Sequence, residues 1–184
     1  MKKKLLIITL LILTACSNLP EKMTADFKDI TPRNGLYYLG DSPAEGEFIS
    51  YYADGSVRAK AAFKGGKYSG PFMAYHETGE KKLETTFEEG QYNGKMKTYY
   101  ENGSVQADTN YEMGNKNGTE LIYYENGQLK SREVYENGEL EGVAREYYDT
   151  GELESIINYK DDNPFGEATF YDKEGNLLDK MYYE

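Results

Sequence analysis

The chain has 184 residues, a formal net charge of −11, no tryptophan and 19 tyrosines. Aliphatic residues are sparse, which disfavours a large globular core and suits a shallow sheet coated with aromatic rings. The negative charge repels phosphate, so nucleic acid and anionic lipid headgroups are poor candidate partners. A basic protein partner, or plain solubility, is the more natural use of this charge.

Residues 1–15 have the pattern of a secretory signal peptide, with three lysines before an apolar run from Leu5 to Leu13. This run is too short for a comfortable membrane span. The Leu-Thr-Ala-Cys tetrapeptide that ends at Cys16 resembles the lipobox of bacterial lipoproteins. The resemblance implies cleavage before Cys16 and its acylation, for example with palmitate. The alternative is an ordinary signal peptide followed by a chance cysteine.

Acylation at Cys16 predicts a lipid-anchored protein of the cell envelope, because two or more acyl chains anchor a protein stably. Cys16 is the only cysteine, so no disulfide chemistry remains once it is modified. Ser17 follows it instead of the aspartate that favours inner-membrane retention. We therefore expect the outer membrane in a Gram-negative source, and otherwise the outer face of the cytoplasmic membrane.

Two short segments precede the repetitive part of the chain. Residues 16–32 contain Pro20 and Pro32 and show little hydrophobic periodicity, which predicts a flexible tether. Residues 33–45 are expected to form an N-terminal capping strand, with Leu39 one step before the first aromatic position of the repeats. Repeat arrays usually need such atypical ends.

From residue 46 onward the chain is a repeat array with a period of 24 residues. Each copy begins at a glycine, which divides the chain into six copies: 46–69, 70–93, 94–117, 118–141, 142–165 and the shorter 166–184. An aromatic residue also recurs every 12 residues, at Tyr51, Phe63, Tyr75, Phe87, Tyr99, Tyr111, Tyr123, Tyr135, Tyr147, Tyr159, Tyr171 and Tyr183. Fixed self-similarity places function on an extended surface more readily than in a cleft.

Each copy is predicted to be a β-hairpin joined to the next by another hairpin. Apolar and polar residues alternate in the second half of a copy, as from Val57 to Phe63, which indicates a half-buried strand. Asn-Gly and Asp-Gly pairs supply the turns. The fold class is therefore all-β, an elongated, twisted antiparallel β-meander of stacked hairpins. Twelve strands at about 4.8 Å would span roughly 55 Å.

The hairpin register depends on the loop type. A two-residue loop places Tyr100 on the face of Val105, whereas a three-residue loop with a glycine bulge places Tyr99 there. We favour the bulged loop, because the aromatic residue present in every copy then joins the apolar face. The aromatic ladder would then form one continuous stack.

Copies such as Tyr123-Tyr124-Glu125-Asn126-Gly127, followed by Tyr135-Glu136-Asn137-Gly138, resemble the bacterial variant of the MORN (membrane occupation and recognition nexus) repeat. His76 and Asp172 replace the second tyrosine of the motif, and Lys81 replaces its usual Val or Leu, which should weaken the second and last copies. The resemblance implies a binding or scaffolding module without catalytic residues. Similar bacterial chains are often labelled antitoxin components, and similar repeats precede the kinase domain of some plant phosphatidylinositol phosphate kinases.

Patterns that would support catalysis, a cofactor or a metal are absent from the sequence. Gly90-Gln91-Tyr92-Asn93-Gly94-Lys95 has the wrong spacing for a phosphate-binding loop. His76, the single histidine, stands where four other copies have tyrosine, so we interpret it as an aromatic substitution. Asp161 and Asp162 are expected in a solvated turn that matches no calcium loop. We therefore predict a protein that is not an enzyme, and a kinase label would reflect repeat similarity alone.

A second aromatic column beside the ladder is the candidate binding stripe. It consists of Tyr52, Tyr100, Tyr124 and Tyr148. The leading hypothesis is a membrane-anchored scaffold that binds another envelope protein, of basic character. The alternatives are an antitoxin or immunity protein that neutralises a toxin, and a cell-wall glycan binder. The uncovered last strand, residues 179–184, could also pair edge to edge in a dimer.

Overall fold

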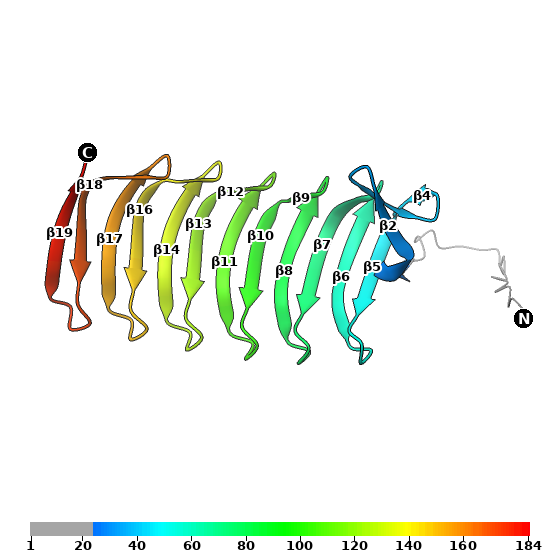
Figure 1. Ribbon diagram of the computed structural model, residues 1–184, viewed down its shortest axis with the longest axis horizontal. Coiled ribbons are helices and arrows are strands. Elements are labelled where there is room, and N and C mark those ends of the chain that lie inside the picture. The colour runs from blue at the N-terminus through cyan, green and yellow to red at the C-terminus, as the bar shows by residue number, and fades with distance from the viewer. Residues whose placement is uncertain (1–23) are drawn as a thin grey trace, which may run out of the picture.

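The computed structural model describes residues 24–184, so the predicted signal peptide and the predicted acylation site at Cys16 lie outside the described residues. These residues form a long row of β-hairpins with a small three-stranded sheet at one end (Figure 1). The predicted all-β class and the meander of stacked hairpins are confirmed. The sheet is not closed, and its two outermost strands are β1 and β19.

The long sheet takes its main strands from consecutive hairpins, and all of these pair antiparallel. They are β5 (Gly46–Tyr51), β6 (Val57–Lys64), β7 (Lys67–Tyr75), β8 (Lys81–Glu88), β10 (Gly94–Tyr99), β11 (Val105–Glu112), β13 (Gly118–Tyr123), β14 (Leu129–Glu136), β16 (Gly142–Tyr147), β17 (Leu153–Lys160), β18 (Asn163–Tyr171) and β19 (Leu177–Tyr183). Three two-residue strands follow the second turns of copies: β9 (Gln91–Tyr92), β12 (Asn115–Lys116) and β15 (Glu139–Leu140).

The first turn of each copy is the expected three-residue loop. In the third copy the Tyr100 amide donates to the Ser104 carbonyl at 2.9 Å, and the Gly103 amide donates to the Tyr100 carbonyl at 3.0 Å. Gly103 has a φ of +83°, the left-handed conformation that this loop requires at its last position. Tyr99 consequently pairs with Val105, as predicted.

The prediction of one continuous aromatic stack is wrong, because a second irregularity follows each of these loops. Thr98 pairs with Ala107, so Gln106 is an extra residue that the alternation rule does not count. The bulge leaves Tyr99 on the opposite face from Ala107 and Tyr111. The ladder therefore divides into two rows, one on each face of the sheet.

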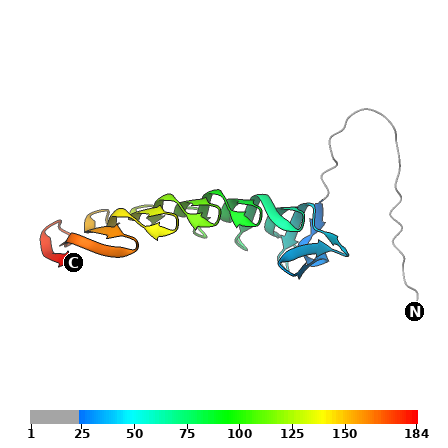
Figure 2. The ribbon, with the colours of Figure 1, turned by 90° about the horizontal axis from the view of Figure 1, so that it is seen from above.

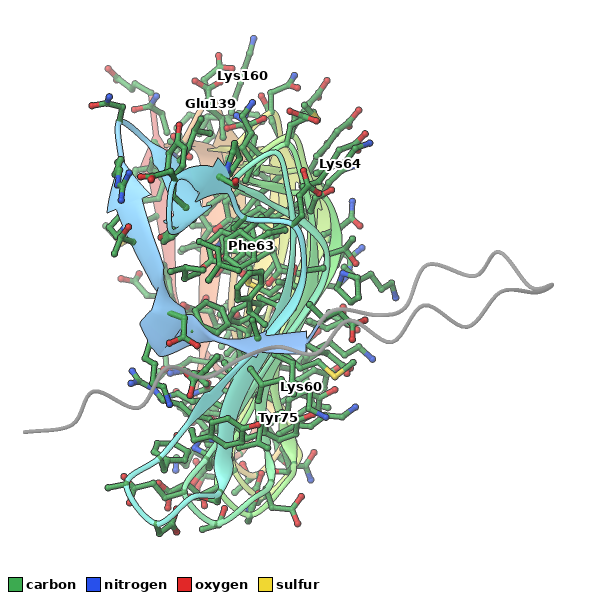
Figure 3. The ribbon with its side chains drawn as sticks, turned by 90° about the vertical axis from the view of Figure 1, so that its right-hand side faces the viewer. Lys60, Phe63, Lys64, Tyr75, Glu139 and Lys160 are labelled. Atoms are coloured by element: carbon green, nitrogen blue, oxygen red, sulfur yellow. The ribbon has the colours of Figure 1, made fainter. Side chains whose placement is uncertain are left out.

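One face, which we call the inner face, carries Phe63 and its equivalents and is covered at its N-terminal end by the small sheet. The opposite, outer face carries Tyr75 and its equivalents. Figure 3 shows Phe63 on the inner side, toward which the strands curve, and Lys60 and Tyr75 on the other side.

On the inner face, rings from the second turns fill the spaces between ladder rings. The centroid distances are 4.4 Å for Phe63–Tyr68, 4.9 Å for Tyr68–Phe87, 4.6 Å for Phe87–Tyr92 and 5.3 Å for Tyr92–Tyr111. Tyr68 and Tyr92 were not singled out from the sequence, although they are separated by one 24-residue period. The inner stack thus contains every second residue of the 12-residue aromatic ladder.

At the second turns, backbone hydrogen bonds link the first copy to the N-terminal cap and each later copy to the one before it. The pairs, each from an amide to a carbonyl, are Gly66 to Ala44 (3.0 Å), Gly90 to Tyr68 (2.8 Å), Gly114 to Tyr92 (2.8 Å), Gly138 to Lys116 (2.8 Å) and Asp162 to Leu140 (3.2 Å). Asp162 also accepts the Leu140 amide through Oδ1 at 2.7 Å. The aspartate in the turn that lacks a glycine therefore preserves this series of hydrogen bonds between copies.

The N-terminal cap begins earlier than expected. Residues 24–32, assigned to the tether from sequence, contribute β1 (Thr24–Asp26), the 3₁₀ turn η1 (Phe27–Asp29) and most of β2 (Ile30–Arg33). β1 pairs parallel with β5 and covers that edge of the long sheet. Figure 2 shows the cap beside the first hairpins. Apolar side chains that the tether interpretation overlooked, Phe27 and Ile30 among them, pack here against Phe48 and Phe63.

Leu39 does not occupy the ladder position expected for it. β3 (Leu36–Leu39) pairs with β2 and with β4 (Ser42–Pro43) in the separate small sheet. The residue that continues the inner stack is Tyr37, whose ring centroid lies 5.3 Å from that of Phe63 and 5.4 Å from that of Tyr68. The cap therefore extends the stack by packing on the inner face, not by adding a strand in sequence.

Gly66 and Gly55 allow a matched test of how the cap attaches. Both have positive φ, +78° and +88°, but a Cβ at Gly66 would lie 2.7 Å from the Tyr37 carbonyl oxygen, whereas a Cβ at Gly55 meets nothing within 4 Å. Gly55→Ala should lower the free energy of unfolding by about 1–2 kcal/mol through backbone strain. Gly66→Ala should lower the free energy of unfolding by a further ~1–3 kcal/mol, because the new Cβ clashes with the Tyr37 carbonyl oxygen. Equal losses in denaturant titrations would contradict this account.

Candidate binding surfaces

The tyrosines of the predicted binding stripe join successive copies along the first-turn rim. Each is half-buried, and each hydroxyl donates to the backbone carbonyl of the outer-face tyrosine one copy later. The bonds are Tyr52 to Tyr75 (2.6 Å), Tyr100 to Tyr123 (2.7 Å), Tyr124 to Tyr147 (2.8 Å) and Tyr148 to Tyr171 (2.8 Å). The structure therefore assigns these hydroxyls to the cohesion of the array.

His76 and Asp172, which replace tyrosine in this column, also form hydrogen bonds with backbone groups. His76 Nε2 lies 2.9 Å from the Tyr99 carbonyl oxygen and donates to it, which fits the interpretation of His76 as an aromatic substitution. Asp172 stands in the copy at residues 166–184. Its carboxylate instead accepts the amides of Glu174 (3.0 Å) and Asn176 (2.7 Å) within its own loop.

The stripe also borders a shallow hollow of about 420 Å³ on the inner face. His76, Leu83, Thr98 and Tyr100 are among its lining residues. The hollow presents mostly ring and aliphatic surface, with the ionisable side chains of His76, Lys82 and Glu101 also in its lining. Within residues 24–184 there is also no group of three His, Cys, Asp or Glu side chains placed to hold a metal ion.

Lys116 shows how the inner face holds an ammonium group. Its Nζ lies 2.6 Å from Glu120 Oε2 and 4.4 Å from the centroid of the Tyr135 ring. The other Glu120 oxygen accepts the Thr109 hydroxyl at 2.8 Å. Glu120 is 6% exposed, so the sheet surface buries this carboxylate almost completely. Carboxylate, tyrosine ring and ammonium together form a compact cation site.

The inner face remains acidic in the next copy, where Leu140 stands 24 residues after Lys116. Glu133 accepts the Tyr135 hydroxyl at 2.7 Å, and Glu146 accepts the Ser155 hydroxyl at 3.0 Å. Burial raises the pKa of Tyr159, and the charges of Glu146 and Glu133 raise it further. Two carboxylates thus lie near a tyrosine ring where the lysine of the preceding copy is replaced by leucine.

Burial of tyrosines predicts a loss of stability at alkaline pH. Burial raises the pKa of Tyr99 from 10.0 to about 12, with the hydrogen bond to Glu84 as the second cause. Burial also raises the pKa of Tyr68 and Tyr135. Because the folded pKa exceeds the unfolded one, this stability is fully present below pH 10 and is lost as pH rises through 12.

The thermal midpoint should therefore begin to fall above about pH 10. Tyrosinate absorbance in the folded protein should develop in more than one step. A single step near pH 10 that involves all 19 tyrosines, before any unfolding, would contradict this prediction.

The C-terminal edge of the long sheet is uncovered among the described residues. β19 is the last strand, and its apolar side chains are exposed: Leu177 by 53%, Leu178 by 63%, Met181 by 47% and Tyr182 by 79%. Unpaired edges of this kind template further strand pairing. We predict concentration-dependent dimers in sedimentation equilibrium, abolished by Met181→Pro. A protein that stays monomeric at the highest soluble concentration would contradict the prediction.

Residues 24–184 contain no helix long and apolar enough to cross a membrane. Comparison with curated proteins finds no match. The family described as the MORN repeat variant matches residues 44–64, 92–113, 116–137, 140–161 and 166–184. The unmatched part between the first two segments contains His76 and Lys81, the departures noted in the second copy. These five segments cover more than half of the chain, which therefore belongs to the MORN repeat variant family.

Proposed function

We propose that this protein is a membrane-anchored, non-catalytic scaffold of the cell envelope that binds a basic segment of another protein on its inner face. A MORN-repeat array fits a protein-binding module, and such repeats are typically non-catalytic. Anchoring at Cys16 rests on the lipobox resemblance. Antitoxin activity and glycan binding are the alternatives that the experiment below must separate.

The observation that carries the proposal is the ammonium site at Lys116, Glu120 and Tyr135. Further along the same face, the charges of Glu133 and Glu146 act on Tyr159. Leu140 stands there at the position of Lys116 and Ala144 at that of Glu120, so a lysine or arginine of a partner would meet two carboxylates and a tyrosine ring without a resident cation. The net charge of −11 speeds the approach of a basic partner. Carboxylates already oriented by hydroxyl groups lose little freedom on binding.

The test is cross-linking in intact cells that produce the tagged full-length chain, followed by denaturing purification. Glu133→Gln combined with Glu146→Gln removes two inner-face charges and keeps side-chain shape. The matched control, Glu101→Gln with Glu125→Gln, removes two charges from exposed first-turn loops. Cys16→Ala removes the proposed anchor.

The proposal expects one dominant basic protein, recovered equally with wild type and control. Recovery should fall roughly tenfold or more with the inner-face variant, because two charged contacts are lost. It should also fall with the unanchored form. A recovered toxin whose activity is blocked would favour the antitoxin alternative. Wall fragments without protein, or equal recovery by all variants, would overturn the proposal.

A separate variant is needed for the tyrosine stripe. Alanine at Tyr100 and Tyr124 would remove both ring surface and inter-copy hydrogen bonds, so loss of binding would not distinguish the two roles. Phenylalanine at both positions keeps the rings and removes only the hydroxyl bonds. If the stripe binds a partner through its rings, the Phe variant should bind normally while its unfolding free energy falls by about 0.5–1.5 kcal/mol per hydroxyl.

A further inference from the structure

The outer face carries one unbroken cross-strand row that runs the length of the array. Each residue pairs with the next across neighbouring strands, with no bulge in the row. In order, the row is Ile49, Lys60, Met73, Glu84, Lys97, Asp108, Leu121, Arg132, Arg145, Ile156, Thr169 and Lys180. Charged residues at several positions of this row differ in whether an opposite charge lies beside them.

In the third copy the charges of the row are balanced. Lys97 lies directly opposite both Glu84 and Asp108, and its Nζ is 3.5 Å from Asp108 Oδ2. At the far end, Lys180 Nζ lies 2.6 Å from Glu167 Oε1. Lys97 and Lys180 in this row are therefore each placed beside an opposite charge, whereas Lys60 lies between the uncharged Ile49 and Met73.

Arg132 and Arg145 are the two cations of the row that face each other. They lie directly opposite each other on β14 and β16, and like charges in that position destabilise a sheet. No carboxylate of the described residues lies within ion-pair distance of either guanidinium. The positions 24 residues earlier are Asp108 and Leu121, so the repeat does not dictate two cations here. The chain has 32 acidic residues, yet none of those within residues 24–184 forms an ion pair with these arginines.

The surroundings of the arginine pair have the composition of a protein interface. Leu121 and Ile156 flank the pair within the row. Tyr123 and Tyr147 lie on the same face, two residues along β13 from Leu121 and along β16 from Arg145. All six side chains are half-buried. Arginine and tyrosine are enriched at binding hot spots, where they combine contact area with directional hydrogen bonds.

We propose that Arg132 and Arg145 form the centre of an outer-face binding site for an acidic protein segment, whose carboxylates they bind side by side. Guanidinium forks match carboxylates in bidentate geometry, and binding would relieve the repulsion between the two arginines. Nucleic acid and anionic membranes present extended arrays of phosphate, which a chain of net charge −11 repels. A short acidic segment requires only the local patch.

This site goes beyond the proposed inner-face function, because it adds a second surface of opposite charge preference on the other side of the same sheet. The test uses the chain without its signal segment and a fluorescent peptide of alternating glutamate and tyrosine. The test variant carries Arg132→Gln and Arg145→Gln. The control variant carries Lys97→Gln and Lys180→Gln, and so removes two cations of the same row that already have ion-pair partners. Arg132→Lys with Arg145→Lys keeps the charge and removes the forks.

We expect the double variant Arg132→Gln with Arg145→Gln to weaken peptide binding at least tenfold. The variant Arg132→Lys with Arg145→Lys should weaken binding by a smaller factor, because it keeps the charges. The Lys97 and Lys180 control should change the affinity by less than about twofold. The peptide should raise the thermal midpoint of wild type but not that of the arginine variant. Equal peptide affinity in all variants would overturn the proposal, as would stronger binding of inorganic phosphate or anionic phospholipid vesicles than of the peptide.

The inner-face variant keeps both proposals separable. Glu133→Gln with Glu146→Gln should lose its cellular partner and still bind the acidic peptide normally. Failure of the cellular cross-linking experiment with normal, arginine-dependent peptide binding would remove the inner-face function alone. An acidic peptide that binds equally well when the arginines are replaced would remove the outer-face site alone.

Discussion

Replacing Phe63 by alanine should lower the free energy of unfolding by about 3–5 kcal/mol, the largest effect of any single side chain considered. Phe63 is 3% exposed, and its ring contacts those of Phe27, Tyr37, Phe48 and Tyr68. It therefore joins the cap, the first hairpin and the inner stack. Its removal leaves a cavity that a sheet one layer thick has few side chains to fill.

Urea titration followed by tyrosine fluorescence would measure this loss. Tyr182→Ala, at the opposite end and 79% exposed, is the matched aromatic control and should change stability by no more than about 0.5 kcal/mol. The Phe63 variant should also expose the cap to limited proteolysis while the C-terminal copies stay protected, since repeats interact mainly with their neighbours. Equal losses for the two variants would contradict the role assigned to Phe63.

Replacing Lys116 by methionine should destabilise the protein by about 3 kcal/mol, because it leaves Glu120 buried without its counter-charge. The lysine side chain is 30% exposed and that of Glu120 is 7% exposed, which places the expected loss at the lower end of the range for buried pairs. Thermal unfolding near neutral pH would measure the change.

A double variant, Lys116→Met with Glu120→Met, separates the ion pair from simple packing. Removing both charges should recover much of the stability, because no uncompensated buried carboxylate remains. Recovery would be incomplete, since the Thr109 hydroxyl loses its acceptor. If the double variant were as unstable as the single variant, the loss would lie in packing and not in the unpaired charge.

The fold could be read from the sequence because its strongest signals are local and repeated. Glycines at fixed spacing and the Glu-Asn-Gly loop specify the hairpins, and the pairing of Tyr99 with Val105 follows from that loop type. The bulge at Gln106 was not predictable, since a polar residue on a strand shows no sign of being an extra one. That single residue decides which face Tyr99 occupies.

The surfaces were harder to predict than the strands. The tyrosine column was correctly separated from the ladder, but its hydroxyl bonds reach carbonyls 23 residues away, which requires the stacking geometry. The cap could not be predicted because residues 24–32 lack periodicity, although Phe27 and Ile30 pack in the apolar cluster. Net charge describes the whole chain, whereas the position of Arg132 opposite Arg145 follows only from the strand register.

The orientation of the strands determines how the array would respond to mechanical tension. The strands lie across the long axis, so the bonds between neighbours point along it (Figure 1). A pull between the two ends would load those bonds in line and open them one strand at a time, instead of shearing many together. The protein should thus extend along its long axis at a lower force than a sheet whose strands run parallel to the pull.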